Sequence, residues 1–146
     1  MANGSYDRVA CCVDLTDRSR GVQARAATLA SMARAELIIV HVAPPPTTAP
    51  SGVIPTTSVP PGATIDLHAG LDSWLTQLAS QDRSARAELI EGLDVGETLC
   101  DWAKANRISL IVTGSREGGM MSTLGSTANY LVRHAPCDVL VVHAEH

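Results

Sequence analysis

The chain has 146 residues, of which 45% are hydrophobic and 3% aromatic, with no phenylalanine. This length fits one domain over residues 1–146, with a core of valine, leucine, isoleucine and alanine. A net charge of −4 argues against the basic surface that attracts nucleic acid or an anionic membrane. The first residues, MANGSYDRV, lack the basic segment and long apolar run expected of a secretory signal, and no stretch approaches the roughly 18 apolar residues that span a bilayer. We therefore expect a cytoplasmic protein without a nucleic-acid or membrane partner.

The first half of the chain alternates apolar runs with helical patterns. Residues 9–13 form a continuous apolar run that ends at Asp14, as expected of a strand buried on both faces. Apolar and small residues then recur at helical spacing over 22–33. Residues 36–42 supply a second buried strand. This order predicts two parallel strands joined by a right-handed helical crossover.

A proline-rich loop follows the second predicted strand. Residues 43–62 hold seven of the eight prolines, and proline neither donates to a sheet nor continues a helix. The segment is longer than usual strand-to-helix connections, which leaves a lid, a binding segment and a solvated spacer as alternatives. Residues 67–78 then carry the apolar stripe of a core-facing helix. Residues 85–91 alternate and carry charge, which predicts a third strand near a sheet edge.

The second half continues the alternation. Residues 95–103 have helical spacing, 108–113 form an apolar strand, and a loop covers 114–124. A fourth helix is predicted from Ser126 to just before Pro136, followed by a last strand over 139–143. Five strands alternating with four helices predict an open α/β domain with a mostly parallel sheet. Ligands in such sheets bind beyond the carboxyl ends of strands, where the strand order reverses.

The loop between the fourth strand and the fourth helix has the composition of an anion site. Its glycines let backbone N–H groups turn toward a ligand, and a helix start adds N–H donors with partial positive charge. The groups expected to bind phosphate are the backbones of Gly114 and Gly125, the hydroxyls of Ser115, Ser126 and Thr127, and the guanidinium of Arg116.

Two common nucleotide motifs do not fit this loop. Gly114 and Gly119 have Walker spacing, but methionines occupy positions 120 and 121, where the motif needs lysine and serine or threonine. No G-x-G-x-x-G follows the first strand, so a Rossmann dinucleotide site is excluded as well.

Taken together, five segments resemble the universal stress protein family over about residues 6–144. They are residues 6–14, residues 35–42, the pair Glu91-Gly92, the run LIVTGS at 110–115, and GSTANYLVRHAPCDVLVVH at 125–143. The resemblance implies a Rossmann-like fold of the adenine nucleotide alpha hydrolase-like type, with strand order 3-2-1-4-5. It also implies a homodimer.

Family members that bind ATP carry the pattern G-x2-G-x9-G-[ST] ahead of the last helix. Gly114 matches its first glycine, and Gly125 with Ser126 matches its final pair. Glu117 stands where the second glycine belongs, and the loop is two residues shorter than the pattern. A carboxylate there would repel a triphosphate if it faced the site. Gly118 can supply the missing glycine through a shifted register.

The resemblance assigns the rest of the site to the first two strands. Asp14 corresponds to the acidic residue that contacts adenosine, and Val42 to the residue whose backbone meets adenine. Thr16 stands where the family often has serine. These positions imply an adenine nucleotide, ATP or AMP, as the ligand of a stress-response protein.

Two functions remain open. In the first, the chain binds ATP or AMP, and the short acidic loop favours the smaller nucleotide. In the second, the chain binds no nucleotide and acts as a dimeric interaction module. The last strand is apolar, and the family's strand order places it at a sheet edge, where a second copy would cover its unpaired backbone groups.

We expect no catalytic centre and no dedicated metal site. The five histidines lack a nucleophile or acid partner evident from the sequence, so we predict a protein that is not an enzyme, with slow ATP hydrolysis left open. The four cysteines lack zinc spacing and are expected to be buried thiols, with Cys11 and Cys12 on opposite faces of one strand. Asp14 and Glu117 could hold Mg²⁺ beside phosphates, but each is explained more simply as a ribose contact or a solvated charge.

Overall fold

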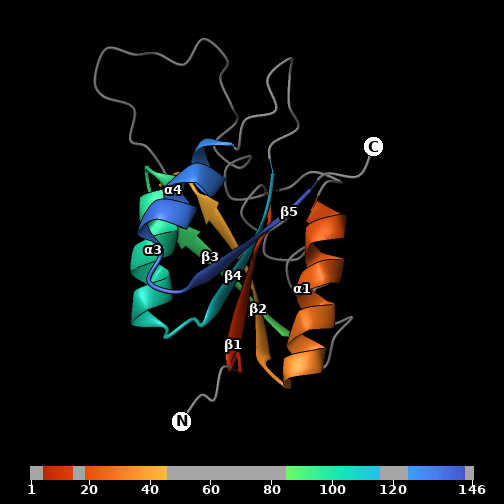
Figure 1. Ribbon diagram of the computed structural model, residues 1–146. Helices are drawn as coiled ribbons and strands as arrows, with labels where there is room; N and C mark the ends of the chain where they lie inside the picture. Colours follow the sequence, from red (N-terminus) through yellow and green to blue (C-terminus); the bar gives the residue numbers. More distant parts are fainter. Residues whose placement is uncertain (1–4, 15–18, 46–84, 116–124, 144–146) are drawn as a thin grey trace, which may run out of the picture.

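The computed structural model describes residues 5–14, 19–45, 85–115 and 125–143. Within these ranges the strands and helices, in chain order, are β1 (Arg8–Cys12), α1 (Ser19–Ala33), β2 (Glu36–Ala43), β3 (Ala85–Glu91), α3 (Val95–Ala105), β4 (Leu110–Gly114), α4 (Ser126–His134) and β5 (Asp138–Val142) (Figure 1). All five predicted strands and three of the four predicted helices are confirmed. The helix predicted over 67–78 and most of the proline-rich loop lie outside the described residues.

The five strands form one parallel sheet. Its order is β3-β2-β1-β4-β5, and each neighbouring pair is parallel. This confirms the predicted order. β1 is central, β3 and β5 are the edges, and the chain moves outward in one direction through β2 and in the other through β4. The strand order therefore reverses between β1 and β4, where their carboxyl ends open a crevice.

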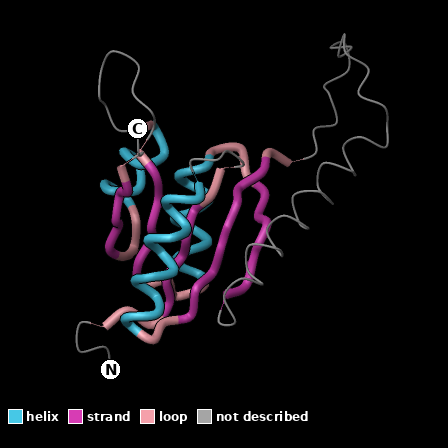
Figure 2. The backbone as a smooth tube through the Cα atoms, turned by 90° about the vertical axis from the view of Figure 1, so that its right-hand side faces the viewer, coloured by secondary structure: helices cyan, strands magenta, loops and turns pink. Residues whose placement is uncertain are grey.

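Helices cover both faces of the sheet. α1 lies on one face, and α3 and α4 lie on the other (Figures 1 and 2). Side chains alternate along β1, so that Val9 and Cys11 pack under α1 while Ala10 packs under α3 and α4. Cys12 contacts the second cluster, which confirms that the adjacent cysteines face opposite sides. The middle strands β1, β2 and β4 are mostly apolar because helices cover both faces of the sheet.

A polar network ties the amino ends of three strands together. Glu36 on β2 pairs with Arg8 Nε of β1 at 3.2 Å and with Arg86 Nε of β3 at 2.7 Å. Arg86 also pairs with Glu88, whose other oxygen accepts from Trp102 Nε1 at 2.7 Å. Partly exposed ion pairs contribute about 0–1 kcal/mol each. Most of the stability therefore comes from the apolar side chains packed on the two faces of the sheet, between β1 and α1 and between β1 and the pair α3 and α4. The ion pairs give the charged side chains of β3 partners within the sheet. The position of β3 at the edge of the sheet confirms the prediction of an edge strand over residues 85–91.

No helix among the described segments is both long and apolar enough to cross a membrane.

Candidate functional site

A cavity of about 520 Å³ opens at the carboxyl ends of β1 and β4. It lies where the strand order reverses, between the first turns of α1 and α4, which belong to opposite faces of the sheet (Figure 1). The residues that line it are Cys12, Val13 and Asp14 after β1; Ser19, Arg20, Gly21 and Val22 on α1; Thr113, Gly114 and Ser115 at β4; Gly125, Ser126, Thr127 and Ala128 at α4; and Val142 and His143 at β5.

The structure brings together six of the ten predicted site residues. Those that line the cavity are Asp14, Gly114, Ser115, Gly125, Ser126 and Thr127. Val42 is not among the lining residues, because its side chain packs in the core under α3 and is only 7% exposed. Its expected contact with adenine runs through the backbone and stays a prediction. Thr16, Arg116 and Gly118 lie outside the described residues, as does Glu117.

The start of α4 forms the wall suited to an anion. Gly125 is the N-cap, at φ −58° and ψ 159°, and it makes no side-chain capping bond. The first bond of the helix runs from Asn129 N–H to the Gly125 carbonyl at 2.9 Å. The N–H groups of Ser126, Thr127 and Ala128 precede that bond, so the helix itself offers them no acceptor. A serine or aspartate cap would accept from this turn with its side chain, whereas glycine has no side chain to do so.

Gly114 allows the end of β4 to approach α1 closely. A Cβ atom at this position would lie 3.1 Å from Cγ2 of Val22, tighter than an ordinary contact. The next residue, Ser115, donates its backbone N–H to the Val142 carbonyl at 2.8 Å, which extends the pairing of β4 with β5. The backbone amide of Ser115 is therefore occupied by the sheet.

Asp14 places a carboxylate on the side of the cavity next to α1. Its backbone N–H donates to Ser19 Oγ at 2.9 Å, and the same hydroxyl donates to Asp14 Oδ1 at 2.9 Å. Ser19 is 3% exposed, whereas Asp14 is exposed. The cavity thus has an electropositive helix end on one side and a hydrogen-bond acceptor on the other. A ligand with an anionic end and a hydroxyl-bearing end matches this polarity.

Sequence reasoning missed Ser19 and several other lining residues. Its only signal for Ser19 was a serine at the start of the helix that follows Asp14. The cavity is also lined by Val22 of α1 and by Val142 and His143 at the end of β5. Their place depends on how the helix and the edge strand approach the crevice. No local pattern in the sequence indicates that approach.

The thiols at and behind the cavity are protonated near neutral pH. Burial raises the pKa of Cys11 to about 12, and it raises the pKa of Cys12, which lines the cavity, well above its usual value. A thiol with a raised pKa is a poor nucleophile. Cys12 therefore acts as a small apolar wall of the cavity. Among the described residues, no three histidine, cysteine or acidic side chains are grouped so as to hold a metal ion.

Comparison with known proteins agrees with this architecture. The chain matches the Universal stress protein family over residues 5–143. It is 31% identical over 142 residues to Universal stress protein A homolog 1 of Coxiella burnetii (strain RSA 493 / Nine Mile phase I), an alignment that covers 94% of this chain and 96% of that protein.

Two of the solved structures that share the fold contain nucleotides. One is a universal stress protein in complex with cAMP, with 21% identity, a TM-score of 0.69, and coverage of 97% of this chain and 99% of that chain. The other is the universal stress protein from Archaeoglobus fulgidus in complex with dAMP, with 20% identity, a TM-score of 0.63, and coverage of 92% and 95%. The family match spans nearly all of the sequence and the sheet has the family's strand order, so this chain belongs to the universal stress protein family.

Proposed function

We propose that the chain binds an adenine nucleotide in the cavity between β1 and β4, in a stress-response role in the cytoplasm. The observation that carries the proposal is the pairing of a glycine-capped helix start with a carboxylate on opposite sides of one cavity. A volume of about 520 Å³ suits a small organic ligand. Structures with the same fold contain cAMP and dAMP, which supports the adenine nucleotide class.

The polarity of the cavity sets the orientation of the ligand. Phosphate oxygens accept from the first N–H groups of α4 and from the hydroxyls of Ser126 and Thr127. The ribose hydroxyls donate to Asp14, because a carboxylate placed beside phosphate would repel it. We assign the adenine contact to the backbone of Val42. In the same proposal, Thr16, Arg116 and Gly118 complete the site.

AMP is the favoured ligand over ATP. The loop is two residues shorter than the family's pattern for ATP, and Glu117 replaces a glycine, so fewer N–H donors and one more negative charge meet the outer phosphates. Mg²⁺ would accompany only the triphosphate, because the ion bridges oxygens of neighbouring phosphates and AMP has a single phosphate.

A single backbone N–H group of α4 provides the test. Ser126 is the first residue of the helix, where proline is tolerated, and Gly125 has the extended ψ of 159° that a residue before proline requires. Ser126→Pro therefore removes one N–H donor and should weaken AMP binding by about tenfold or more, the loss expected for one charge-assisted hydrogen bond. The measurement is isothermal titration with AMP and ATP.

Ser126→Ala is the matched control, because it removes the hydroxyl and keeps the N–H group. It should weaken AMP binding less than Ser126→Pro does. If the wild-type chain binds neither nucleotide, the proposal is wrong and the dimeric interaction module is the better account.

We also propose that the chain forms a homodimer through β5. Among the strands that the structure describes, β5 is paired on one side, with β4, and Leu140 on it is 39% exposed. An unpaired apolar edge is a template for pairing with another strand, and a two-fold axis would cover both copies at once.

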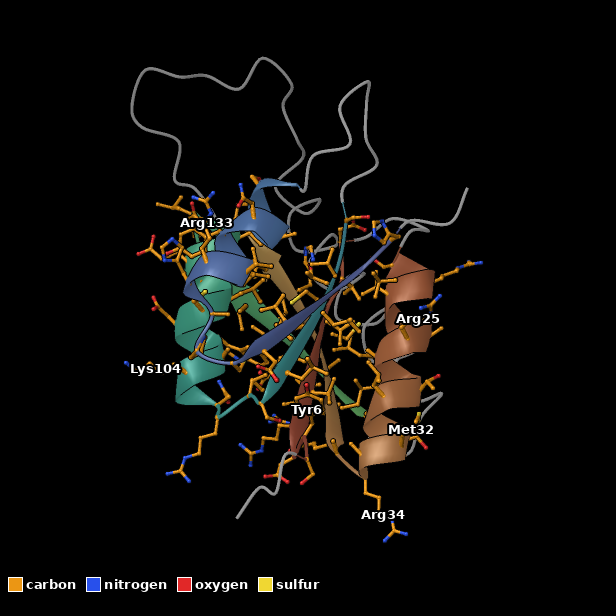
Figure 3. The ribbon with its side chains drawn as sticks, viewed as in Figure 1. Tyr6, Arg25, Met32, Arg34, Lys104 and Arg133 are labelled. Carbon is orange, nitrogen blue, oxygen red and sulfur yellow. The ribbon has the colours of Figure 1, made fainter. Side chains whose placement is uncertain are left out.

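Replacing Leu140 with lysine should shift the protein from dimer to monomer, because two like charges would meet across the axis. Analytical ultracentrifugation at micromolar concentration measures this. Met32→Lys is the matched control: Met32 is 78% exposed on α1 and points away from the sheet (Figure 3), so its replacement should leave the dimer intact. A wild-type monomer, or equal effects of the two lysines, contradicts dimerisation through β5.

A further inference from the structure

Thr113 is a buried residue whose hydroxyl faces the cavity. It is the fourth residue of β4, is 6% exposed and lines the cavity. Within the described part of the chain, the Thr113 hydroxyl makes no hydrogen bond, and no side-chain oxygen or nitrogen is sealed from solvent without a partner. The Thr113 oxygen is therefore open to the cavity. Ser19, the other buried polar residue among those described, has its hydroxyl bonded to Asp14.

The packing of β4 does not use this hydroxyl. The two preceding residues, Ile111 and Val112, are fully buried and apolar. Valine has nearly the same shape as threonine, so it would fill the same space without a polar group. A buried polar group without a partner costs free energy relative to an apolar group of that shape. Position 113 thus carries a hydrogen-bonding group whose partner comes from outside the described chain.

Alternation along β4 places the Thr113 side chain on the face of the sheet that α4 covers (Figure 1). Val112 packs in the cluster under α1, and Ile111 packs in the cluster under α3 and α4, so Thr113 points to the same face as Ile111. Ala128, the third residue of α4, lines the cavity from that face. The Thr113 hydroxyl therefore lies on the side of the cavity where the first N–H groups of α4 open.

The floor of the cavity, formed by Cys12 of β1 and Thr113 of β4, carries no charge. Val112 pairs with Cys11, so the next residues of the two strands, Thr113 and Cys12, lie side by side, and both line the cavity. Burial raises the pKa of the Cys12 thiol well above its usual value, so the thiol is protonated near neutral pH. An anion that accepts from the N–H groups of α4 meets a further donor at this floor and no thiolate.

We propose that the Thr113 hydroxyl donates a hydrogen bond to the phosphate of the bound nucleotide, from the floor of the cavity. A phosphate oxygen that accepts from the N–H groups of α4 keeps further lone pairs, and a hydroxyl beside those groups is placed to donate to them. The inference rests on the proposed nucleotide function. It adds a phosphate contact from the sheet to the contacts that the function assigns to α4.

Thr113→Val tests this contact, because valine removes the hydroxyl and keeps the shape of the side chain. It should weaken AMP binding by about tenfold or more, the loss expected for a hydrogen bond to a charged group, and change adenosine binding by less than about twofold. Adenosine is the comparison because it lacks only the phosphate. Thr113→Ser keeps the hydroxyl and should bind AMP within about fourfold of the wild-type chain, the effect of one lost methyl group. Isothermal titration gives all of these affinities.

The valine variant should also be more stable than the wild-type chain when no nucleotide is present. It should melt about 2–6 °C higher, because the unpaired hydroxyl is gone and the packing is kept. Thermal unfolding monitored by circular dichroism measures this shift. A lower melting temperature would show that the fold itself uses the hydroxyl and would overturn the inference.

Thr28→Val is the matched control, because it makes the same replacement at an exposed position of α1. The Thr28 hydroxyl bonds to the Ala24 carbonyl, and its loss should affect the binding of neither ligand. If Thr113→Val leaves AMP binding unchanged, or weakens AMP and adenosine equally, Thr113 does not contact the phosphate; either result overturns the inference and leaves the proposed function standing. A wild-type chain that does not bind AMP rejects both.

Discussion

Leu131→Ala should lower the free energy of unfolding by about 2–5 kcal/mol, the range for removing a fully buried leucine side chain from a packed core. Leu131 is 0% exposed, and it anchors α4 in the apolar cluster that contains Ala10 of β1 and Ile111 of β4. The cavity left by alanine lies between a helix and the two central strands, which cannot close it without moving the helix. With a typical total stability of about 5–15 kcal/mol, this loss would be a large fraction of the whole.

Val132→Ala is the control for this prediction. Val132 follows directly on the same helix but is 48% exposed, so its truncation removes little buried surface and should change stability by less than about 1 kcal/mol. Urea unfolding monitored by circular dichroism measures both variants. A similar small change for the two would show that α4 is not anchored in the core, and the wall of the cavity that it forms would then lack support.

The strands were predictable because burial on both faces leaves a strong pattern. β1, β2 and β4 read as mostly apolar runs, and in the structure they are the three inner strands. β3 was weaker as a sequence signal for the same physical reason: it is an edge strand that carries Arg86 and Glu88, and Arg86 pairs with Glu88 and with Glu36. The order of the strands came from the family resemblance, since periodicity does not say which strands are neighbours.

The candidate site was predictable where topology alone places a residue. Asp14 follows β1, and Gly114 is the last residue of β4. β1 and β4 are the neighbouring strands at which the strand order reverses, so the two residues lie together at the carboxyl ends of the strands. The contact of Ser19 with Asp14 was not predictable, because it depends on a hydrogen-bond geometry set by the seating of α1. The family resemblance assigned an adenine contact to the backbone of Val42. The structure shows that the side chain of Val42 packs in the core.

The packing of α3 on α4 was also missed, although it positions one wall of the cavity. Gly96, the second residue of α3, lies against Tyr130 of α4: an added Cβ would be 2.7 Å from Cδ1 and 2.9 Å from Cβ of the tyrosine. The tyrosine Cβ is fixed to the helix backbone, so it cannot rotate away. The ring is further confined by His134, whose ring centroid is 4.4 Å from its own. A glycine in a helix reads only as a weak helix former, and the sequence does not show that a neighbouring helix requires it.

Gly96→Ala should therefore destabilise the protein by about 1–3 kcal/mol, the range for overpacking, even though alanine is the better helix former by about 1 kcal/mol. Gly21→Ala should do the opposite. Gly21 is the third residue of α1, and an added Cβ there meets nothing within 4 Å, so only the propensity acts and stability should rise by about 0.5–1 kcal/mol. Urea unfolding of the two variants distinguishes a steric requirement from a general property of glycine in a first helical turn.

Gly96→Ala also tests whether α4 transmits packing to the cavity. Gly96 does not line the cavity. The methyl group of an alanine at this position would overlap Tyr130, and α4 must move to remove the overlap. The first N–H groups of α4 form the wall assigned to phosphate, so this movement should reach the cavity. Gly96→Ala should then weaken AMP binding in a protein that is still folded at the assay temperature. Unchanged AMP binding together with lowered stability would show that the first turn of α4 stays in place while the middle of the helix moves. The position of that first turn would then depend on β4 and not on the packing of α3 against α4.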